Sequence, residues 1–138
     1  MEQDEPAIDA LVAAFFSAFD NRDGKLPTGR GFEALFGPSA LIVTHAASGP
    51  QVATPTAFVE PRIALLKSGE LVDFHEWETE SRTEIVGSLA VRRSRYAKQG
   101  TLRGAPYDGK GTKYFQFARL EQRWRIVAVS WIDDPAAA

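Results

Sequence analysis

His45 is the side chain of this sequence best suited to acid–base chemistry at neutral pH, and it closes a short apolar run, ALIVTHA. A neutral imidazole, with an ordinary pKa of about 6.5, can remove a proton from carbon or oxygen inside an apolar pocket. Equally, a histidine at a strand end can be satisfied by a backbone carbonyl or by solvent. The other histidine, His75, lies in a strand-like segment beside Trp77. We take His45 as the candidate catalytic residue and keep the structural alternative open.

Metal and cofactor motifs are missing from the sequence. There is no cysteine, and the two histidines are too far apart for zinc-ligand spacing. GAPYDGKG, residues 104–111, nearly matches the phosphate-binding loop GxxxxGK(S/T), but Gly111 replaces the hydroxyl that would bind Mg²⁺. A strand-like segment also follows it, where phosphate binding needs a helix N-terminus. We predict no metal and no cofactor, and we interpret residues 99–111 as a loop near the mouth of a pocket.

Four glutamates lie close together in FHEWETESRTE, residues 74–84. Gly87 suits the first central position of a two-residue type II′ turn, which fixes the register of the hairpin around it. That register pairs Glu78 with Ala97, Glu80 with Arg95, Arg82 with Arg93, and Glu84 with Val91. Because arginines alternate with the glutamates, we interpret Glu76, Glu78, Glu80 and Glu84 as a solvated or subunit-facing surface with cross-strand charge pairs.

The opposite face of this hairpin has small hydroxyls between large aromatics, which leaves room for a cavity. Arg92 lies on this face and could pair with a ligand carboxylate, or its side chain could extend into solvent at the hairpin tip. The last hairpin and the first helix add further aromatic side chains. The predicted ligand-binding residues are Phe15, Phe19, Trp77, Thr79, Arg92, Ser94, Tyr96, Phe115, Phe117 and Ser130.

The composition indicates one globular domain over residues 1–138. Sixteen Lys and Arg against eighteen Asp and Glu give a net charge of −2, which offers no field for nucleic acid or an anionic membrane. In RRSRYAK, residues 92–98, strand alternation sends the arginines to different faces, so we predict no nucleic-acid binding. The acidic N-terminus does not resemble a signal peptide, and no apolar run is long enough to span a membrane, so we expect a cytoplasmic protein.

Helical periodicity dominates the first half of the sequence and strand periodicity the second. Helices are expected from Pro6 to about residue 19, over residues 30–37, and over residues 54–70, where Pro61 either kinks the helix or marks its first turn. A short strand is expected at residues 40–46. Four long strands follow at residues 71–86, 89–99, 112–120 and 123–132, with Glu121 and Gln122 as the last turn. This order predicts an α+β domain with an antiparallel meander.

Several of these segments together resemble the nuclear transport factor 2-like superfamily, near its SnoaL-like polyketide cyclases and ketosteroid isomerases. They are the amphipathic first helix, the NRDG loop, the short LFGP helix, FVEPR in the next helix, and the closing strand WRIVAVSW. The resemblance implies a cone-shaped, curved antiparallel sheet wrapped around the N-terminal helices, with a pocket at its open end. It also implies a small apolar ligand and an isomerase, dehydratase or cyclase. The alternative is a non-catalytic ligand-binding or homodimerisation domain.

The resemblance also bears on the catalytic candidate. Related isomerases place a carboxylate base about four residues before a glycine, after the second helix. Here that segment is IVTHAASG, in which His45 stands four residues before Gly49 and no acid is near. We therefore expect His45 at the pocket and do not expect steroid isomerisation.

The outward face of the last hairpin predicts a homodimer. If Trp124, Ile126, Ala128 and Ser130 face the helices, then alternation turns the residues between them outward. The predicted interface residues are Tyr114, Gln116, Val127, Val129 and Trp131. Such an apolar stripe is larger than monomers usually expose, and aromatic residues are enriched at interface cores.

Overall fold

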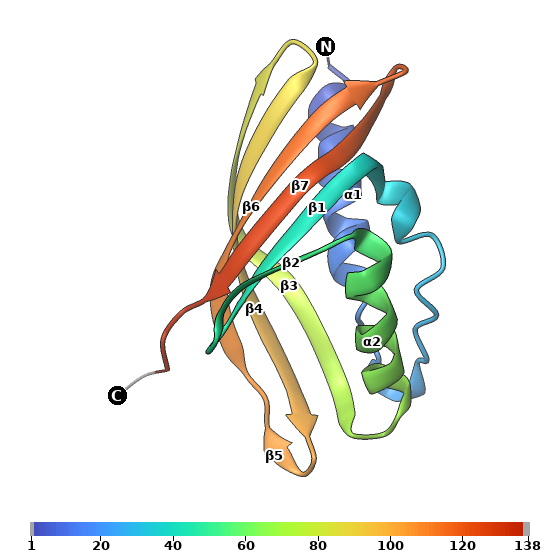
Figure 1. The fold of residues 1–138 in the computed structure, drawn as a ribbon, viewed down its shortest axis with the longest axis vertical. Coiled ribbons are helices and arrows are strands. Elements are labelled where there is room, and N and C mark those ends of the chain that lie inside the picture. The colour runs from blue at the N-terminus through green and yellow to red at the C-terminus, as the bar shows by residue number, and fades with distance from the viewer. Residues whose placement is uncertain (1, 137–138) are drawn as a thin grey trace.

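A computed structural model describes residues 2–136, in which a strongly curved sheet holds two α-helices on its concave side (Figure 1). Helix α1 spans Asp4–Ser17 and α2 spans Pro55–Lys67. Single 3-10 turns, η1 at Arg22–Gly24 and η2 at Glu33–Leu35, lie between α1 and the sheet. Neither α-helix within these residues is both long and apolar enough to cross a membrane.

The two α-helices form where the sequence periodicity predicts them. In α1 the apolar stripe is buried, and Phe15 packs against Phe16, Phe32 and Phe115 at ring-centroid distances of 5.4–5.9 Å. The Thr54 hydroxyl accepts a hydrogen bond from the Ala57 amide at 3.1 Å, so Thr54 is the N-cap of α2. Pro61 lies inside α2, and the helix continues through it to Lys67.

Seven strands of residues 2–136 form one sheet. They are β1 (Phe36–Ala46), β2 (Gly49–Ala53), β3 (Leu71–Val86), β4 (Leu89–Leu102), β5 (Ala105–Pro106), β6 (Gly109–Leu120) and β7 (Arg123–Asp133). Their order is β2-β1-β7-β6-β4-β3, with β5 paired to β4 alone. The α+β class and the curved sheet are confirmed, although the sheet is mixed because β1 runs parallel to β7.

Three local predictions need correction. The helix expected at residues 30–37 is a single 3-10 turn, and strand β1 already begins at Phe36 and continues through Gly37 and Pro38. Strand β2 was not predicted. Most of the loop expected at residues 99–111 belongs to β4, β5 and β6, and the strand conformation from Gly109 onward excludes a phosphate-binding loop.

Both predicted two-residue turns are present. Val86 pairs with Leu89 around Gly87, whose φ is 57°. Leu120 pairs with Arg123, and the turn residues Glu121 and Gln122 have φ of 50° and 68°. Positive φ at both central positions is typical of a type I′ turn, and the twist of this turn suits a hairpin. The turn forms here although neither central residue is a glycine.

Two of the β-bulges in the sheet change which of the predicted side chains face the helices. In β3 the register shifts between Glu78, which pairs with Tyr96, and Glu80, which pairs with Arg95. In β7 it shifts between Ile126, which pairs with Phe117, and Ala128, which pairs with Gln116. An extra residue bends a strand and reverses its alternation on one side of the bulge.

The first bulge corrects the interpretation of the glutamates. Glu80 and Glu84 are exposed and face Arg95 and Val91 as predicted, but Glu76 and Glu78 turn inward. Glu78 consequently pairs with Tyr96 instead of Ala97. Trp77 and Thr79, predicted to line the pocket, are exposed instead, and Trp77 stacks on His75 at a centroid distance of 4.3 Å.

The second bulge corrects the predicted dimer stripe. Trp124 and Ile126 face inward as expected, but beyond the bulge Val129 and Trp131 also face inward, and Val129 is only 1% exposed. Ser130, predicted to bind ligand, therefore lies on the outer face with Ala128.

Asn21, in the NRDG segment that follows α1, forms side-chain hydrogen bonds to α2 and β3. Its side-chain amide donates to the carbonyl oxygens of Leu66 and Leu71 at 3.0 and 2.7 Å, and its Oδ1 accepts from the Phe74 amide at 2.7 Å. These bonds satisfy a buried amide and fix α1, α2 and β3 relative to one another.

Gly111 of β6 leaves space for the Tyr96 side chain of β4 to reach β7. Tyr96, Gly111 and Asp133 are neighbours across β4, β6 and β7, and the Tyr96 hydroxyl donates to Asp133 over the glycine. A Cβ at position 111 would lie 2.2 Å from the Tyr96 hydroxyl oxygen and 2.5 Å from the Ile132 carbonyl oxygen.

We expect Gly111→Ala to lower the free energy of unfolding by about 2 kcal/mol or more, because it combines overpacking with loss of a buried hydrogen bond. Gly109→Ala is the matched control on the same strand. Its Cβ would meet only the flexible end of Lys98 at 3.0 Å, so its cost should stay below about 1 kcal/mol. Urea denaturation of both variants measures the difference, and equal losses would contradict this account.

Candidate ligand-binding cavity

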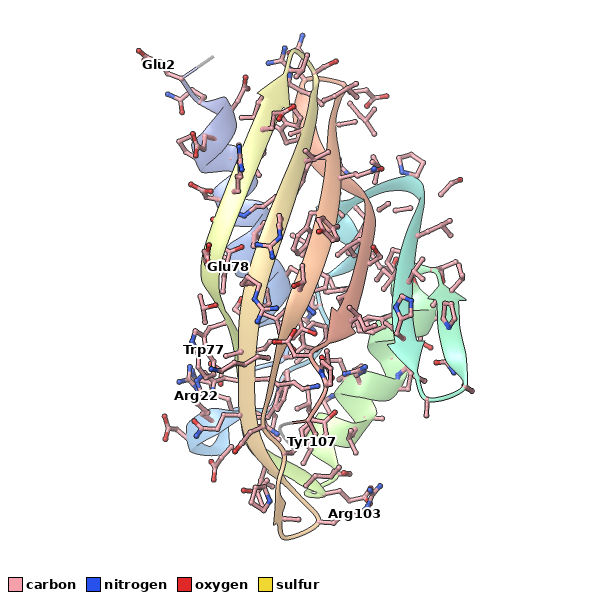
Figure 2. The ribbon with its side chains drawn as sticks, turned by 90° about the vertical axis from the view of Figure 1, so that its left-hand side faces the viewer. Glu2, Arg22, Trp77, Glu78, Arg103 and Tyr107 are labelled. Carbon is pink, nitrogen blue, oxygen red and sulfur yellow. The ribbon has the colours of Figure 1, made fainter. Side chains whose placement is uncertain are left out.

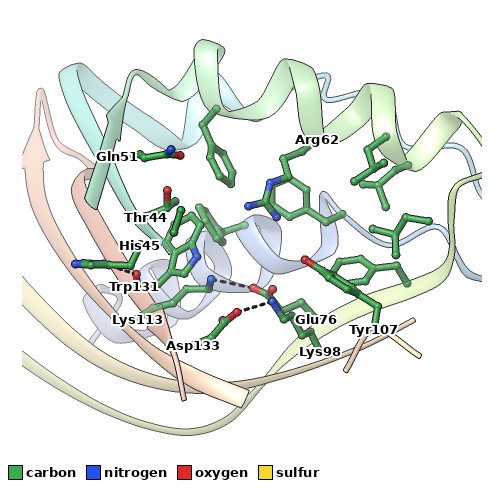
Figure 3. Close-up of a pocket in the computed structure, with 18 residues that line it drawn as sticks. Thr44, His45, Gln51, Arg62, Glu76, Lys98, Tyr107, Lys113, Trp131 and Asp133 are labelled. Carbon is green, nitrogen blue, oxygen red and sulfur yellow. Dashed lines mark hydrogen bonds and ion pairs between the residues drawn. The ribbon is translucent and has the colours of Figure 1, made fainter. Parts of the chain in front are cut away.

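A cavity of about 210 Å³ lies between α2 and the concave face of the sheet (Figure 3). Side chains from α1 and the turn after it, and from α2, β3 and β7, give it apolar walls. These wall residues are Phe15, Phe19, Phe58, Leu65, Leu66, Leu71, Phe74 and Trp131. Charged side chains line the same cavity from the sheet side, so it combines an apolar body with localised polar groups, as ligand pockets do.

The central charge is Lys113 of β6, which is 1% exposed. Its Nζ lies 2.9 Å from Oε1 of Glu76 on β3 (Figure 3). It also lies 3.7 Å from the ring centroid of Trp131 and 4.2 Å from that of Tyr96, which stabilises the cation through the aromatic faces. Burial lowers the pKa of Lys113 to about 8, although the charge and hydrogen bond of Glu76 oppose this shift.

A second charged group lies beside this pair. Asp133 of β7 accepts hydrogen bonds from the Tyr96 hydroxyl and from Nζ of Lys98, the latter at 2.8 Å. Burial would raise the pKa of Asp133, but these two bonds hold it below its ordinary value. Burial and the neighbouring Asp133 raise the pKa of Tyr96, so its hydroxyl keeps its proton and acts as a donor.

Arg92 and Ser94, both predicted to bind ligand, are part of an internal network outside this cavity. Arg92 forms an ion pair with Glu78 at 2.5 Å and another with Asp9 at 2.5 Å, and the Ser94 hydroxyl donates to Glu78 at 2.6 Å. Burial opposes the charge of Arg92, but the two carboxylates raise its pKa above the ordinary value. The bulge in β3 brings Glu78 inward, so these groups satisfy one another.

The other predicted site residues divide into three groups. Phe15 and Phe19 line the cavity. Tyr96, Phe115 and Phe117 are buried on the inner face, where Tyr96 supports the charged groups and the two phenylalanines pack in the core. Trp77, Thr79 and Ser130 lie outside the cavity because of the bulges (Figure 2 shows Trp77).

His45 lies at the rim of the cavity and is exposed. Its Nδ1 is 3.1 Å from the carbonyl oxygen of Trp131, which can only accept, so Nδ1 carries the proton in this bond. This is the backbone-bonded arrangement that was the alternative to catalysis. His75 lies outside the cavity, and burial together with the charge of Arg22 lowers its pKa.

The charged residues of the cavity were missed by the sequence analysis. Lys113 had a signal, because in KYFQF it shares a strand face with Phe115 and Phe117. Glu76 and Asp133 had none, since each lies beyond a bulge that reverses the alternation. Arg62, Thr44 and Gln51 also line the cavity, from α2, β1 and β2. Within residues 2–136 no three His, Asp or Glu side chains gather closely enough to hold a metal ion.

Known structures identify the architecture. A nuclear transport factor 2-like protein with a cystatin-like fold from Novosphingobium aromaticivorans superposes with a TM-score of 0.72 over 99% of this chain and 85% of its own, at 15% identity. This chain has the nuclear transport factor 2-like fold. A nuclear transport factor 2-like protein of unknown function from Prochlorococcus gives a TM-score of 0.72 at 17% identity, covering 97% of this chain and 95% of its own.

A third structure with this fold, a protein of unknown function with a cystatin-like fold from Nostoc punctiforme, covers 99% of this chain and 95% of its own, with a TM-score of 0.72 and 14% identity. No family model and no curated protein sequence matches the chain. At these identities the likeness establishes the nuclear transport factor 2-like fold and leaves function to the side chains of the cavity.

The lowered pKa of Lys113 predicts a distinctive pH dependence of stability. Below about pH 8 this lysine is charged in both the folded and the unfolded chain, so the cost of burying its charge is fully present. Between about pH 8 and its ordinary value of 10.5 the folded chain has released the proton and the unfolded chain has not, so stability rises with pH. The rise should approach about 3 kcal/mol.

Replacing both partners isolates this contribution. The variant Lys113→Met/Glu76→Gln should lack the rise, so the difference in unfolding free energy between wild type and variant should grow from pH 8 to pH 10.5. The single Lys113→Met change should be more costly at pH 7 than the double change, because it leaves Glu76 without its partner. Parallel pH profiles of wild type and double variant in urea would contradict the assignment.

Proposed function

We propose that the cavity binds a small organic molecule with an apolar body. The observation that carries this proposal is Lys113, a charged side chain that is almost fully buried yet lines a cavity with apolar walls. A charge kept in such a place is costly to stability, and charged groups of this kind concentrate at functional sites. The nuclear transport factor 2-like fold supports the proposal, because the cavity lies in the cone of its sheet.

The size of the cavity limits the ligand. Pockets for drug-sized molecules are roughly 300–1,000 Å³, and this one is about 210 Å³. A single aromatic ring or a short aliphatic chain with one polar substituent fits that volume. Phe58, Leu65 and Phe74 would contact the apolar body, and the polar substituent would face the charged side chains.

A second candidate function is proton transfer on a bound carbonyl compound, as an isomerase, dehydratase or cyclase requires. Two features favour it: Glu76 can accept a proton and Lys113 can donate one within the same cavity, and the pKa of Lys113 is lowered to about 8. This candidate uses Glu76 and Lys113 in place of His45 as the acid–base groups. Proton transfer, unlike simple binding, would exchange protons of the bound ligand for protons of the solvent.

The sheet's outer face supports a further proposal, a homodimer with a corrected interface. Leu41, Val91, Tyr114 and Ile132 are 47–57% exposed on β1, β4, β6 and β7. Gln116 and Ala128 lie between Leu41 and Val91 in register, and Glu84 and Arg93 lie at one side. We propose that a second copy covers this face. In a two-fold pair each patch meets itself, so Glu84 of one copy can approach Arg93 of the other.

The three tryptophans provide a direct test of ligand binding. Trp131 lines the cavity, whereas Trp77 lies at the outer surface and the Trp124 indole donates to Asp4 at 2.9 Å. Titration with p-cresol should shift the indole N–H resonance of Trp131 and leave those of Trp77 and Trp124 in place. Leu65→Phe, which fills the cavity, should weaken the response, and Leu26→Phe at an exposed loop position should not. Equal shifts at all three indoles would refute binding in the cavity.

The dimer is tested by placing a charge in the patch. We expect Val91→Glu to convert a wild-type dimer to monomer, since it places a carboxylate beside Glu84, its cross-strand neighbour, inside the interface. Leu26→Glu, at a position 66% exposed and outside the patch, is the control and should remain dimeric. Light scattering after size exclusion measures both, and a monomeric wild type at tens of micromolar would overturn the proposal.

A further inference from the structure

The charges that line the cavity do not cancel. Three cations, Arg62, Lys98 and Lys113, face two carboxylates, Glu76 and Asp133. Lys113 pairs with Glu76 at 2.9 Å and Lys98 with Asp133 at 2.8 Å. Among residues 2–136 no Asp or Glu forms an ion pair with Arg62. The cavity therefore carries one cation in excess, and that cation is a guanidinium.

Arg62 is positioned to meet a ligand. It projects from α2 into the cavity, on the side opposite Glu76 and Lys113 (Figure 3). Its guanidinium carbon lies 5.0 Å from the ring centroid of Phe58, one turn earlier on α2, and this contact orients it. The charge of Arg62 also contributes to lowering the pKa of Lys113, so the two cations repel each other. A bound anion would relieve that repulsion.

Two more hydrogen-bonding side chains at the cavity have no partner among the described residues. Thr44 of β1 and Gln51 of β2 face each other in register, and both line the cavity. The Thr44 hydroxyl and the Gln51 amide each offer a donor. Thr44, Gln51 and Arg62 thus line the cavity with donors that have no carboxylate partner, while the carboxylates of Glu76 and Asp133 are already paired (Figure 3).

We propose that the ligand is a small carboxylic acid, bound as its anion, with the carboxylate on Arg62 and its apolar body among the wall residues. The inference rests on the proposed ligand binding and adds the chemical class. A guanidinium matches a carboxylate with two parallel hydrogen bonds, and Thr44 and Gln51 add further donors to the lining of the same cavity. The single excess charge favours a carboxylate over a phosphate, whose charge at pH 7 is roughly −1.5 to −2 and would exceed it.

The test compares four probes that share one phenyl ring: phenylacetate, phenylacetamide, 2-phenylethanol and 2-phenylethylamine. The Trp131 indole resonance reports their binding at pH 7. We expect wild type to bind phenylacetate at least tenfold more tightly than phenylacetamide, and the amine least. Arg62→Gln should remove the preference for the acid while leaving the affinity for the amide within about twofold. Arg62→Lys, which keeps the charge without the planar fork, should retain only part of the preference.

Lys67→Gln is the matched control. It removes the same charge from another exposed position of the same helix, but Lys67, in the last turn, does not line the cavity. It should bind the acid as wild type does. If phenylacetate binds no better than the amide, or if Arg62→Gln keeps the preference, the carboxylate assignment is wrong while binding of the amide still supports the cavity. If none of the four probes moves the Trp131 resonance, both proposals fail.

Discussion

The extra residues in β3 and β7 are the constraint on which the rest of this structure depends. Side chains of a strand alternate between two faces, so one inserted residue exchanges the faces beyond it. Here the exchange brings Glu76 and Glu78 inward on β3, and Val129, Trp131 and Asp133 inward on β7. The bulges also bend their strands. The inserted residues therefore have two effects. They bend the sheet, and they determine which charged side chains face its concave side.

The charges turned toward the concave side of the sheet are paired between different strands. Lys113 of β6 meets Glu76 of β3, and Arg92 of β4 meets Glu78 of β3. Asp133 of β7 meets Lys98 and Tyr96 of β4, with Gly111 of β6 leaving the space that the tyrosine crosses. Breaking one such pair leaves an uncompensated buried charge, which is more costly than removing both members. The register of four strands is thus linked to the electrostatics of the site.

Much of the fold could be predicted from the sequence, since its signals are local. The apolar stripe of α1, the Thr54 cap of α2 and the turn at Gly87 are each set by neighbouring residues. Strands β2 and β5 are too short to produce a periodic pattern. The bulges have no such local signature: neither Thr79 nor Val127 is a glycine or proline. The faces of both strands were therefore right on one side of the bulge and wrong on the other.

The candidate site was less predictable than the fold because its residues are brought together only by the curved sheet and α2. Phe15 and Phe19 could be found from helical periodicity, and Lys113 could have been found from its alternation with Phe115 and Phe117. Arg62 lies on a helix whose sequence contains no motif for the ligand-binding role proposed for it, and its excess charge appears only when the charges around the cavity are paired. Function in this fold has to be argued from such pairings.

The structural neighbours show how loosely this fold constrains that chemistry. They retain TM-scores of 0.72 at 14–17% identity, so the curved sheet tolerates replacement of most side chains. What the fold supplies is a concave space between sheet and helix. The few charged groups turned inward give that space its chemical character, and in this chain they sum to one positive charge beside aromatic walls. A buried lysine that is costly to stability is retained in that space, which is the pattern expected where a sequence departs from ideal packing for the sake of a site.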